Sequence, residues 1–138
     1  MSQQTPSVGV VVIGRNEGER LRTCLQALLR AELPVARIVY VDSGSSDGSV
    51  DIAAGLGIHA IALSPPFTAA KGRNAGMAWL LAQADAPFAI QFVDGDCEYF
   101  PSWFEVAART LRDDDSIAAV NGILTERHPE ATIWNLLC

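Results

Sequence analysis

The chain has 138 residues, of which 49% are hydrophobic and 19% are charged, the balance of an ordinary globular domain. A chain of this length buries roughly two thirds of its unfolded surface, so it needs neither disulfides nor a structural metal to hold a core. The formal net charge of -6 excludes a general nucleic-acid or anionic-membrane partner, because both bind basic surfaces. We therefore expect one domain over residues 1–138 that binds any anionic ligand locally.

The three cysteines, Cys24, Cys97 and Cys138, are odd in number and show no C-x-x-C spacing and no clustered histidines, so the sequence predicts neither a zinc site nor a disulfide framework. Residues 1–7 lack the basic start and apolar run of a signal peptide, and no stretch reaches transmembrane length. We expect reduced thiols and a cytoplasmic protein, and association with a membrane through a separate segment stays open.

Short runs rich in β-branched residues predict strands over residues 8–13, 37–41, 58–63, 88–93 and 117–124. Helical spacing occupies the gaps between them. Three helices are predicted, each with one apolar face. The first face is formed by Leu21, Cys24, Leu25, Leu28 and Leu29, the second by Met77, Leu80, Leu81 and Ala84, and the third by Trp103, Ala107 and Leu111. Alternating strands and helices predict an α/β fold, in which a mostly parallel sheet carries helices on both faces.

Ligands of such sheets bind beyond the carboxyl ends of the strands. The segments at those ends are residues 14–18, 42–48, 64–72 and 94–97. After residue 124 an apolar tail follows, with Ile133, Trp134, Leu136 and Leu137. Nothing after this tail covers it, so we expect the chain to be part of a larger fold.

Two carboxylates, Asp94 and Asp96, flank Gly95 at the end of the fourth apolar run. Carboxylate oxygens suit hard cations such as Mg²⁺ or Mn²⁺, which commonly bridge protein carboxylates to substrate phosphates. A D-G turn followed by a helix-capping acid explains the same three residues. From this tripeptide alone the two interpretations are equally supported.

The other strand ends carry small, polar and basic residues. Asp42 is placed to accept hydrogen bonds from a base or ribose, whereas Asp47 is expected to cap the next helix. Lys71 and Arg73 lie near the start of a helix, where cations oppose the helix dipole unless they face an anion such as a diphosphate. Asn16 is interpreted as a structural helix cap. An ordinary strand-to-helix loop and an exposed solubilising pair explain these segments equally well when each is taken alone.

Together these segments resemble the N-terminal half of family 2 glycosyltransferases with the GT-A fold, over nearly the whole chain. The motifs are an opening strand with Asn16-Glu17, an Asp-rich turn at residues 41–49, the segment 71–76 and the D-x-D sequence Asp94-Gly95-Asp96. Each motif alone is weakly specific, whereas four in the family's order are specific. Ser43 stands where the family often has a second aspartate, so one donor contact is either lost or made by Asp42 alone.

The resemblance implies a Rossmann-like donor site for a nucleoside-diphosphate sugar, with a UDP-sugar favoured and the acceptor unknown. It assigns substrate binding to Ile13, Gly14, Arg15, Glu17, Asp42, Lys71, Arg73, Asp94 and Gly95. It assigns Mn²⁺ or Mg²⁺ to Asp96 with Asp94, with Asp96 as the direct ligand. Transfer with inversion is implied, and the catalytic base is expected beyond residue 138, so this chain is expected to be inactive alone.

The alternative hypothesis is a non-catalytic assembly module that keeps the fold and forms a homodimer through the apolar tail. A nucleotidyltransferase is disfavoured because residues 14–17 do not supply its glycine-rich phosphate loop. A D-x-D phosphatase is disfavoured because its carboxylate pair is expected after the first strand rather than the fourth. Nucleotide binding that depends on a metal ion is expected for a donor domain and not for an assembly module, so it distinguishes the two hypotheses.

Overall fold

The computed structural model describes residues 7–32, 37–100, 102–126 and 128–131. Strands and helices alternate along the chain as β1 (Val8–Gly14), α1 (Glu19–Arg30), β2 (Ile38–Asp42), α2 (Ser49–Gly55), β3 (His59–Ala62), α3 (Ala69–Leu81), β4 (Ala89–Asp94) and α4 (Trp103–Asp113). The first four predicted strands and the α/β class are confirmed, with strand ends that differ by at most one residue. No helix in the described part of the chain is long and apolar enough to cross a membrane.

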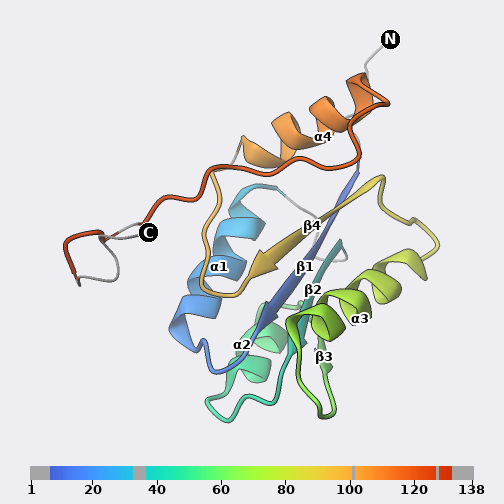
Figure 1. Ribbon diagram of the computed structural model, residues 1–138. Coiled ribbons are helices and arrows are strands. Elements are labelled where there is room, and N and C mark those ends of the chain that lie inside the picture. The colour runs from blue at the N-terminus through green and yellow to red at the C-terminus, as the bar shows by residue number, and fades with distance from the viewer. Residues whose placement is uncertain (1–6, 33–36, 101, 127, 132–138) are drawn as a thin grey trace.

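The four strands form one parallel sheet in the order β3-β2-β1-β4 (Figure 1). In the register of the sheet, Gly14 at the end of β1 lies opposite Asp42 of β2. Ile13 lies opposite Asp94 of β4. Because all strands run the same way, the loops that follow them leave from a single edge.

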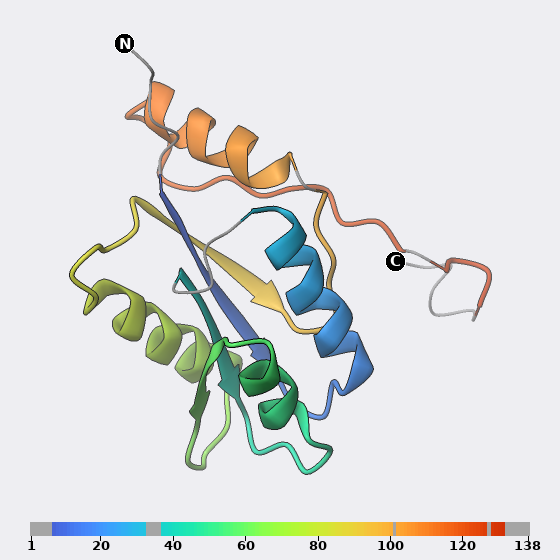
Figure 2. The same cartoon turned by 180° about the vertical axis from the view of Figure 1, so that it is seen from behind.

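Helices cover both faces of the sheet (Figure 2). On one face, α1, α2 and α4 pack against β1, β2 and β4 around a buried cluster that includes Leu25, Ala53, Phe104 and Val12. On the other face α3 packs on β1 and β2, and its Leu80 joins the second buried cluster. The sheet is therefore the middle layer of three, as alternating elements predict.

The predicted apolar face of α3 is wrong in part. Leu81 is 53% exposed and Ala84 lies beyond the end of the helix, whereas the buried positions are Gly72, Gly76 and Leu80. An added Cβ at Gly76 would lie 2.4 Å from Val11 Cγ1. The helix contacts the sheet through glycines, a face that a search for bulky apolar residues does not detect.

The face of α4 is also displaced from the prediction. Phe104 and Ala108 are its buried residues, whereas Trp103 and Ala107, on the predicted face, are half-buried. The indole of Trp103 donates a hydrogen bond to Gln91 Oε1 at 2.8 Å. Packing of this tryptophan is thus confirmed, but at the margin of the core, where its N–H finds a polar partner.

The predicted fifth strand over residues 117–124 is absent. These residues belong to no strand, and Ile123 and Leu124 are 94% and 84% exposed. The segment runs back along α4 (Figures 1 and 2), where Gly122 lies beside the Trp103 ring. β-branched residues favour strands only where a neighbouring strand and a buried face receive them. The predicted apolar tail, with Ile133 and Trp134, lies outside the described residues.

Candidate functional site

Hydrogen bonds at the carboxyl edge of the sheet fix where three of the loops begin. The amide of Gly95 donates to Ile13 O at 2.8 Å, and that of Ser43 donates to Gly14 O at 3.0 Å. The amide of Leu63 donates to Asp42 O at 2.9 Å. These bonds extend the pairing past the strands, so the loops leave from a rigid base.

The predicted carboxylate pair lies on this edge, at the end of β4. The Asp94 side chain is 58% exposed, and one of its oxygens lies 3.1 Å from the Arg73 guanidinium of α3. Asp96 is exposed as well. Gly95 between them is buried, and an added Cβ there would lie 3.3 Å from Ile13 O. The tight turn at this glycine leaves both carboxylates open to a ligand.

Glu17, from the loop after β1, is a third carboxyl group at this edge. Its side chain is 18% exposed and lies 2.9 Å from the Arg20 guanidinium, although Oε2 has no partner with hydrogen-bond geometry. Burial raises the pKa of Glu17, Arg20 opposes that rise, and the nearby carboxylates of Asp96, Asp47 and Asp94 add to it. The edge therefore carries excess negative charge next to the carboxylate pair.

A divalent cation fits the carboxylate pair in one binding mode only. No group of three or more His, Cys, Asp or Glu side chains in the described ranges is arranged to hold a metal ion by itself. Two exposed carboxylates match the mode in which Mg²⁺ or a similar cation binds one or two carboxylates and takes its remaining ligands from water and substrate phosphates. The oxygen chemistry and exposure of Asp94 and Asp96 are compatible with this mode, in which a phosphorylated ligand supplies further oxygens.

Asp42 organises the loop after β2. It is 3% exposed, and Oδ1 accepts a hydrogen bond from the Tyr40 hydroxyl at 2.8 Å. Oδ2 accepts from the amides of Gly44 and Ser45 at 3.0 and 2.8 Å. Both carboxylate oxygens of Asp42 already accept hydrogen bonds from donors of the protein. To contact a base or ribose as predicted, one of these oxygens would have to accept a further hydrogen bond.

Asn16 joins the β1 loop to the β2 loop. Its amide donates to Ser45 Oγ at 2.9 Å, and its Oδ1 accepts from the amide of Ser46 at 2.8 Å. The structural role predicted for Asn16 is present, but the predicted helix cap is wrong, because Gly18 is the N-cap of α1. Asn16 adopts φ 56°, a conformation that asparagine tolerates better than most residues.

Asp47 supports the start of α2 from one residue before its N-cap, Gly48. Its Oδ1 accepts hydrogen bonds from the amide and hydroxyl of Ser49 at 3.0 and 2.6 Å, and these bonds lower its pKa. Asp47 has the structural role predicted for it, but the predicted helix cap is wrong, because Gly48 is the N-cap of α2 and has no side chain to make a cap hydrogen bond.

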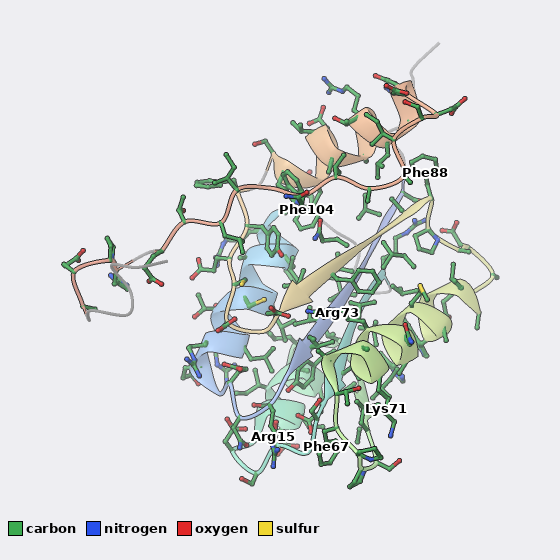
Figure 3. The ribbon with its side chains drawn as sticks, viewed as in Figure 1. Arg15, Phe67, Lys71, Arg73, Phe88 and Phe104 are labelled. Atoms are coloured by element: carbon green, nitrogen blue, oxygen red, sulfur yellow. The ribbon has the colours of Figure 1, made fainter. Side chains whose placement is uncertain are left out.

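Of the three predicted cations, Arg15 comes from the loop after β1, whereas Lys71 and Arg73 both come from the first half of α3 (Figure 3). Lys71 Nζ donates to the carbonyl oxygens of Ser64 and Pro66, so it secures the β3–α3 loop. Arg73 pairs with Asp94. The Arg15 guanidinium lies over the ring of Phe67, with Cζ 5.5 Å from the ring centroid. Phe67 is the residue that sequence patterns missed, because its partners come from other loops.

Comparison with known proteins finds relatives of this chain in two bacteria. The chain is 29% identical over 126 residues to YibD, an uncharacterized glycosyltransferase of Escherichia coli K12, covering 88% of this chain and 35% of YibD. It is 28% identical over 122 residues to EpsH of Bacillus subtilis 168, whose glycosyltransferase assignment is provisional, covering 86% of this chain and 34% of EpsH. The chain thus spans about a third of the length of these relatives.

Solved structures of Staphylococcus aureus TarS share the fold. Residues 1–349 of TarS superpose with a TM-score of 0.66 at 19% identity, over 87% of this chain and 39% of that one. The complex of the same TarS residues with UDP-GlcNAc superposes with a TM-score of 0.60 at 20% identity, over 78% and 31% of the two chains. The model of the family described as "Glycosyl transferase family 2" matches residues 9–136. The match covers nearly the whole chain, which therefore belongs to glycosyl transferase family 2.

Proposed function

We propose that this chain is the donor-binding part of a metal-assisted glycosyltransferase. Its ligand is a nucleoside-diphosphate sugar bound at the carboxyl edge of the sheet, and the sugar passes with inversion to an acceptor that other parts of the enzyme bind. The observation that carries the proposal is the exposed pair Asp94 and Asp96 at the carboxyl edge, with the Arg73 guanidinium 3.1 Å from Asp94. Paired carboxylates beside a guanidinium suit a diphosphate that is shared with a cation. We assign Lys71 to the diphosphate and Arg15 to the base.

The protein's own groups have separable tasks in this proposal. Asp94 and Asp96 would hold the cation, which would supply stabilisation of the negative charge on the leaving diphosphate. Arg73 pairs with Asp94, and its guanidinium has further donors for the diphosphate. Glu17 lies close to Asp94 and Asp96 and is mostly buried. Its carboxylate repels further negative charge that binds at this edge.

A uridine nucleotide is the donor we favour. The complex of TarS, a protein of similar fold, with UDP-GlcNAc supports a nucleotide-sugar ligand. Ile13 and Gly14, near the end of β1, and Asp42, at the end of β2, flank the place proposed for the base and ribose. The chain covers about a third of its relatives, so we propose that it binds the donor but does not complete transfer alone.

Calorimetric titration of UDP into the chain, with and without Mn²⁺, tests the proposal. We expect saturable binding that needs Mn²⁺ and that Asp96→Ala abolishes. Asp115→Ala, which removes an exposed carboxylate after α4, is the matched control and should bind as the unsubstituted chain does. Absence of binding to UDP, GDP and dTDP in the presence of Mn²⁺ would refute the proposal and favour the assembly module.

A further inference from the structure

Phe67 is a contact point for three loops of the carboxyl edge, although no motif of the family resemblance includes it. It lies in the segment between β3 and α3, two residues before the helix begins. Arg15 reaches its ring from the loop after β1, and Gly44 meets it from the loop after β2. The labelled side chains of Arg15 and Phe67 lie together at this end of the molecule (Figure 3).

The contact with Gly44 leaves no room for a side chain. A Cβ at Gly44 would lie 2.8 Å from Phe67 Cζ, closer than real Cβ contacts allow, and 3.1 Å from Cε2, which is a tight contact. Gly44 also has φ 82°, and its amide is held by Asp42. The edge of the Phe67 ring therefore contacts the backbone at Gly44, and the buried carboxylate of Asp42 holds that backbone in place.

Hydrogen bonds from the start of α3 also hold the loop that carries Phe67. Lys71 Nζ donates to the carbonyl oxygens of Ser64 and Pro66, and the Thr68 hydroxyl accepts from the amide of Lys71 at 3.1 Å. The ring thus has little freedom to move relative to the sheet. The Arg15 side chain is exposed, so on its own it would sample many rotamers.

We propose that Phe67 is a positioning residue that holds the Arg15 guanidinium as a platform on which the base of the donor nucleotide stacks. The inference rests on the proposed function. An aromatic ring attracts a guanidinium to its face, and the planar guanidinium is itself a surface on which an aromatic ring stacks. Ring, guanidinium and base then form successive layers. Since every base has a π-face, the platform adds affinity without selecting the base.

A double-mutant cycle with Phe67→Leu and Arg15→Ala tests this arrangement. UDP and pyrophosphate are each titrated into the chain and its variants in the presence of Mn²⁺. We expect Phe67→Leu to weaken UDP binding roughly ten-fold, the size of one base–aromatic stack, and to leave pyrophosphate binding within two-fold. The double variant should bind UDP no more weakly than Arg15→Ala alone, because Phe67 acts through Arg15.

A matched pair of glycines separates the ring contact from backbone strain. Gly44 and Gly48 have φ of 82° and 83°, but an added Cβ at Gly48 meets nothing within 4 Å. Both alanine variants therefore carry the same conformational strain, and only Gly44→Ala displaces Phe67. We expect Gly44→Ala to weaken UDP binding as Phe67→Leu does, and Gly48→Ala to leave it unchanged.

Two results would overturn the inference while the proposed function stands. One is normal UDP binding by Phe67→Leu, and the other is equal weakening of UDP and pyrophosphate, which indicates a general structural defect. Additive effects of Phe67→Leu and Arg15→Ala would also overturn it. Failure of the unsubstituted chain to bind UDP would instead refute the proposed function, and this inference with it.

Discussion

The close packing of α3 on the sheet predicts that Gly76→Ala destabilises the chain. An added methyl would lie 2.4 Å from Val11 Cγ1, 3.0 Å from Val11 Cγ2 and 3.1 Å from Val41 Cγ2, where ordinary contact begins near 3.4 Å. Both methyl groups of Val11 face the new atom, so rotation of that buried, β-branched side chain gives no relief. The helix must move away by about 1 Å at this point.

The net effect is a balance of two opposing terms. Alanine favours a helix over glycine by about 1 kcal/mol, whereas overpacking a buried contact costs about 1 to 3 kcal/mol. With a clash this short we expect the larger cost, and Gly76→Ala should lower the free energy of unfolding by about 1 to 2 kcal/mol. The displaced helix also carries Lys71 and Arg73, so UDP binding should weaken.

Gly55→Ala is the matched control for this prediction. Gly55 is the last residue of α2, and an added Cβ there meets nothing within 4 Å. Only the propensity term acts, and it is smaller at a helix end, so the variant should gain about 0.5 kcal/mol. Urea denaturation of both variants, followed by circular dichroism, measures the difference. A Gly76→Ala variant as stable as the unsubstituted chain would refute the glycine-mediated packing of α3.

Two further predictions concern buried polar groups at the carboxyl edge. Glu17→Gln should raise the melting temperature at pH 7, because burial raises the pKa of Glu17 in the folded state above its ordinary value, so that ionised Glu17 destabilises the fold. The gain should shrink as the pH falls and the Glu17 carboxyl becomes protonated in both the folded and the unfolded chain. A gain of undiminished size at about pH 4 would contradict the assigned cause. Tyr40→Phe should lower the free energy of unfolding, measured in urea, by about 2 kcal/mol. The substitution removes the hydroxyl that donates a hydrogen bond to Oδ1 of the buried Asp42. Unchanged stability would show that this bond contributes nothing.

The strands and the carboxyl edge could be predicted from the sequence because their signals are local. Runs such as Val10 to Ile13 are β-branched and buried throughout, which is what a parallel strand covered on both faces requires. The order of strands and helices then forces the polar ends of β1, β2 and β4 onto one edge. The position of the carboxylate pair at residues 94–96 on this edge follows from that placement, whereas the metal-binding role assigned to it rests on the resemblance to family 2 glycosyltransferases.

The features that could not be predicted depend on contacts between distant residues. The buried face of α3 is made of glycines, which carry no apolar signal, and its recognition needs the position of Val11. The segment over residues 117–124 has strand composition, yet Ile123 is exposed because no strand in the described residues receives it. Phe67 reads as an ordinary loop residue until Gly44 and Arg15 are placed around it.

The location of the nucleotide and cation is the central claim, and paramagnetic broadening tests it directly. Amide resonances of the ¹⁵N-labelled chain are recorded with saturating UDP and a trace of Mn²⁺, against a control with Mg²⁺. We predict that the amides of Gly14 and Gly95 broaden first, because they lie at the ends of β1 and β4 beside Asp94 and Asp96. The amides of Gly57 and Phe88, which precede β3 and β4 at the opposite edge, should keep their intensity. Broadening centred on that opposite edge, or no selective broadening with UDP present, would contradict the proposed donor site.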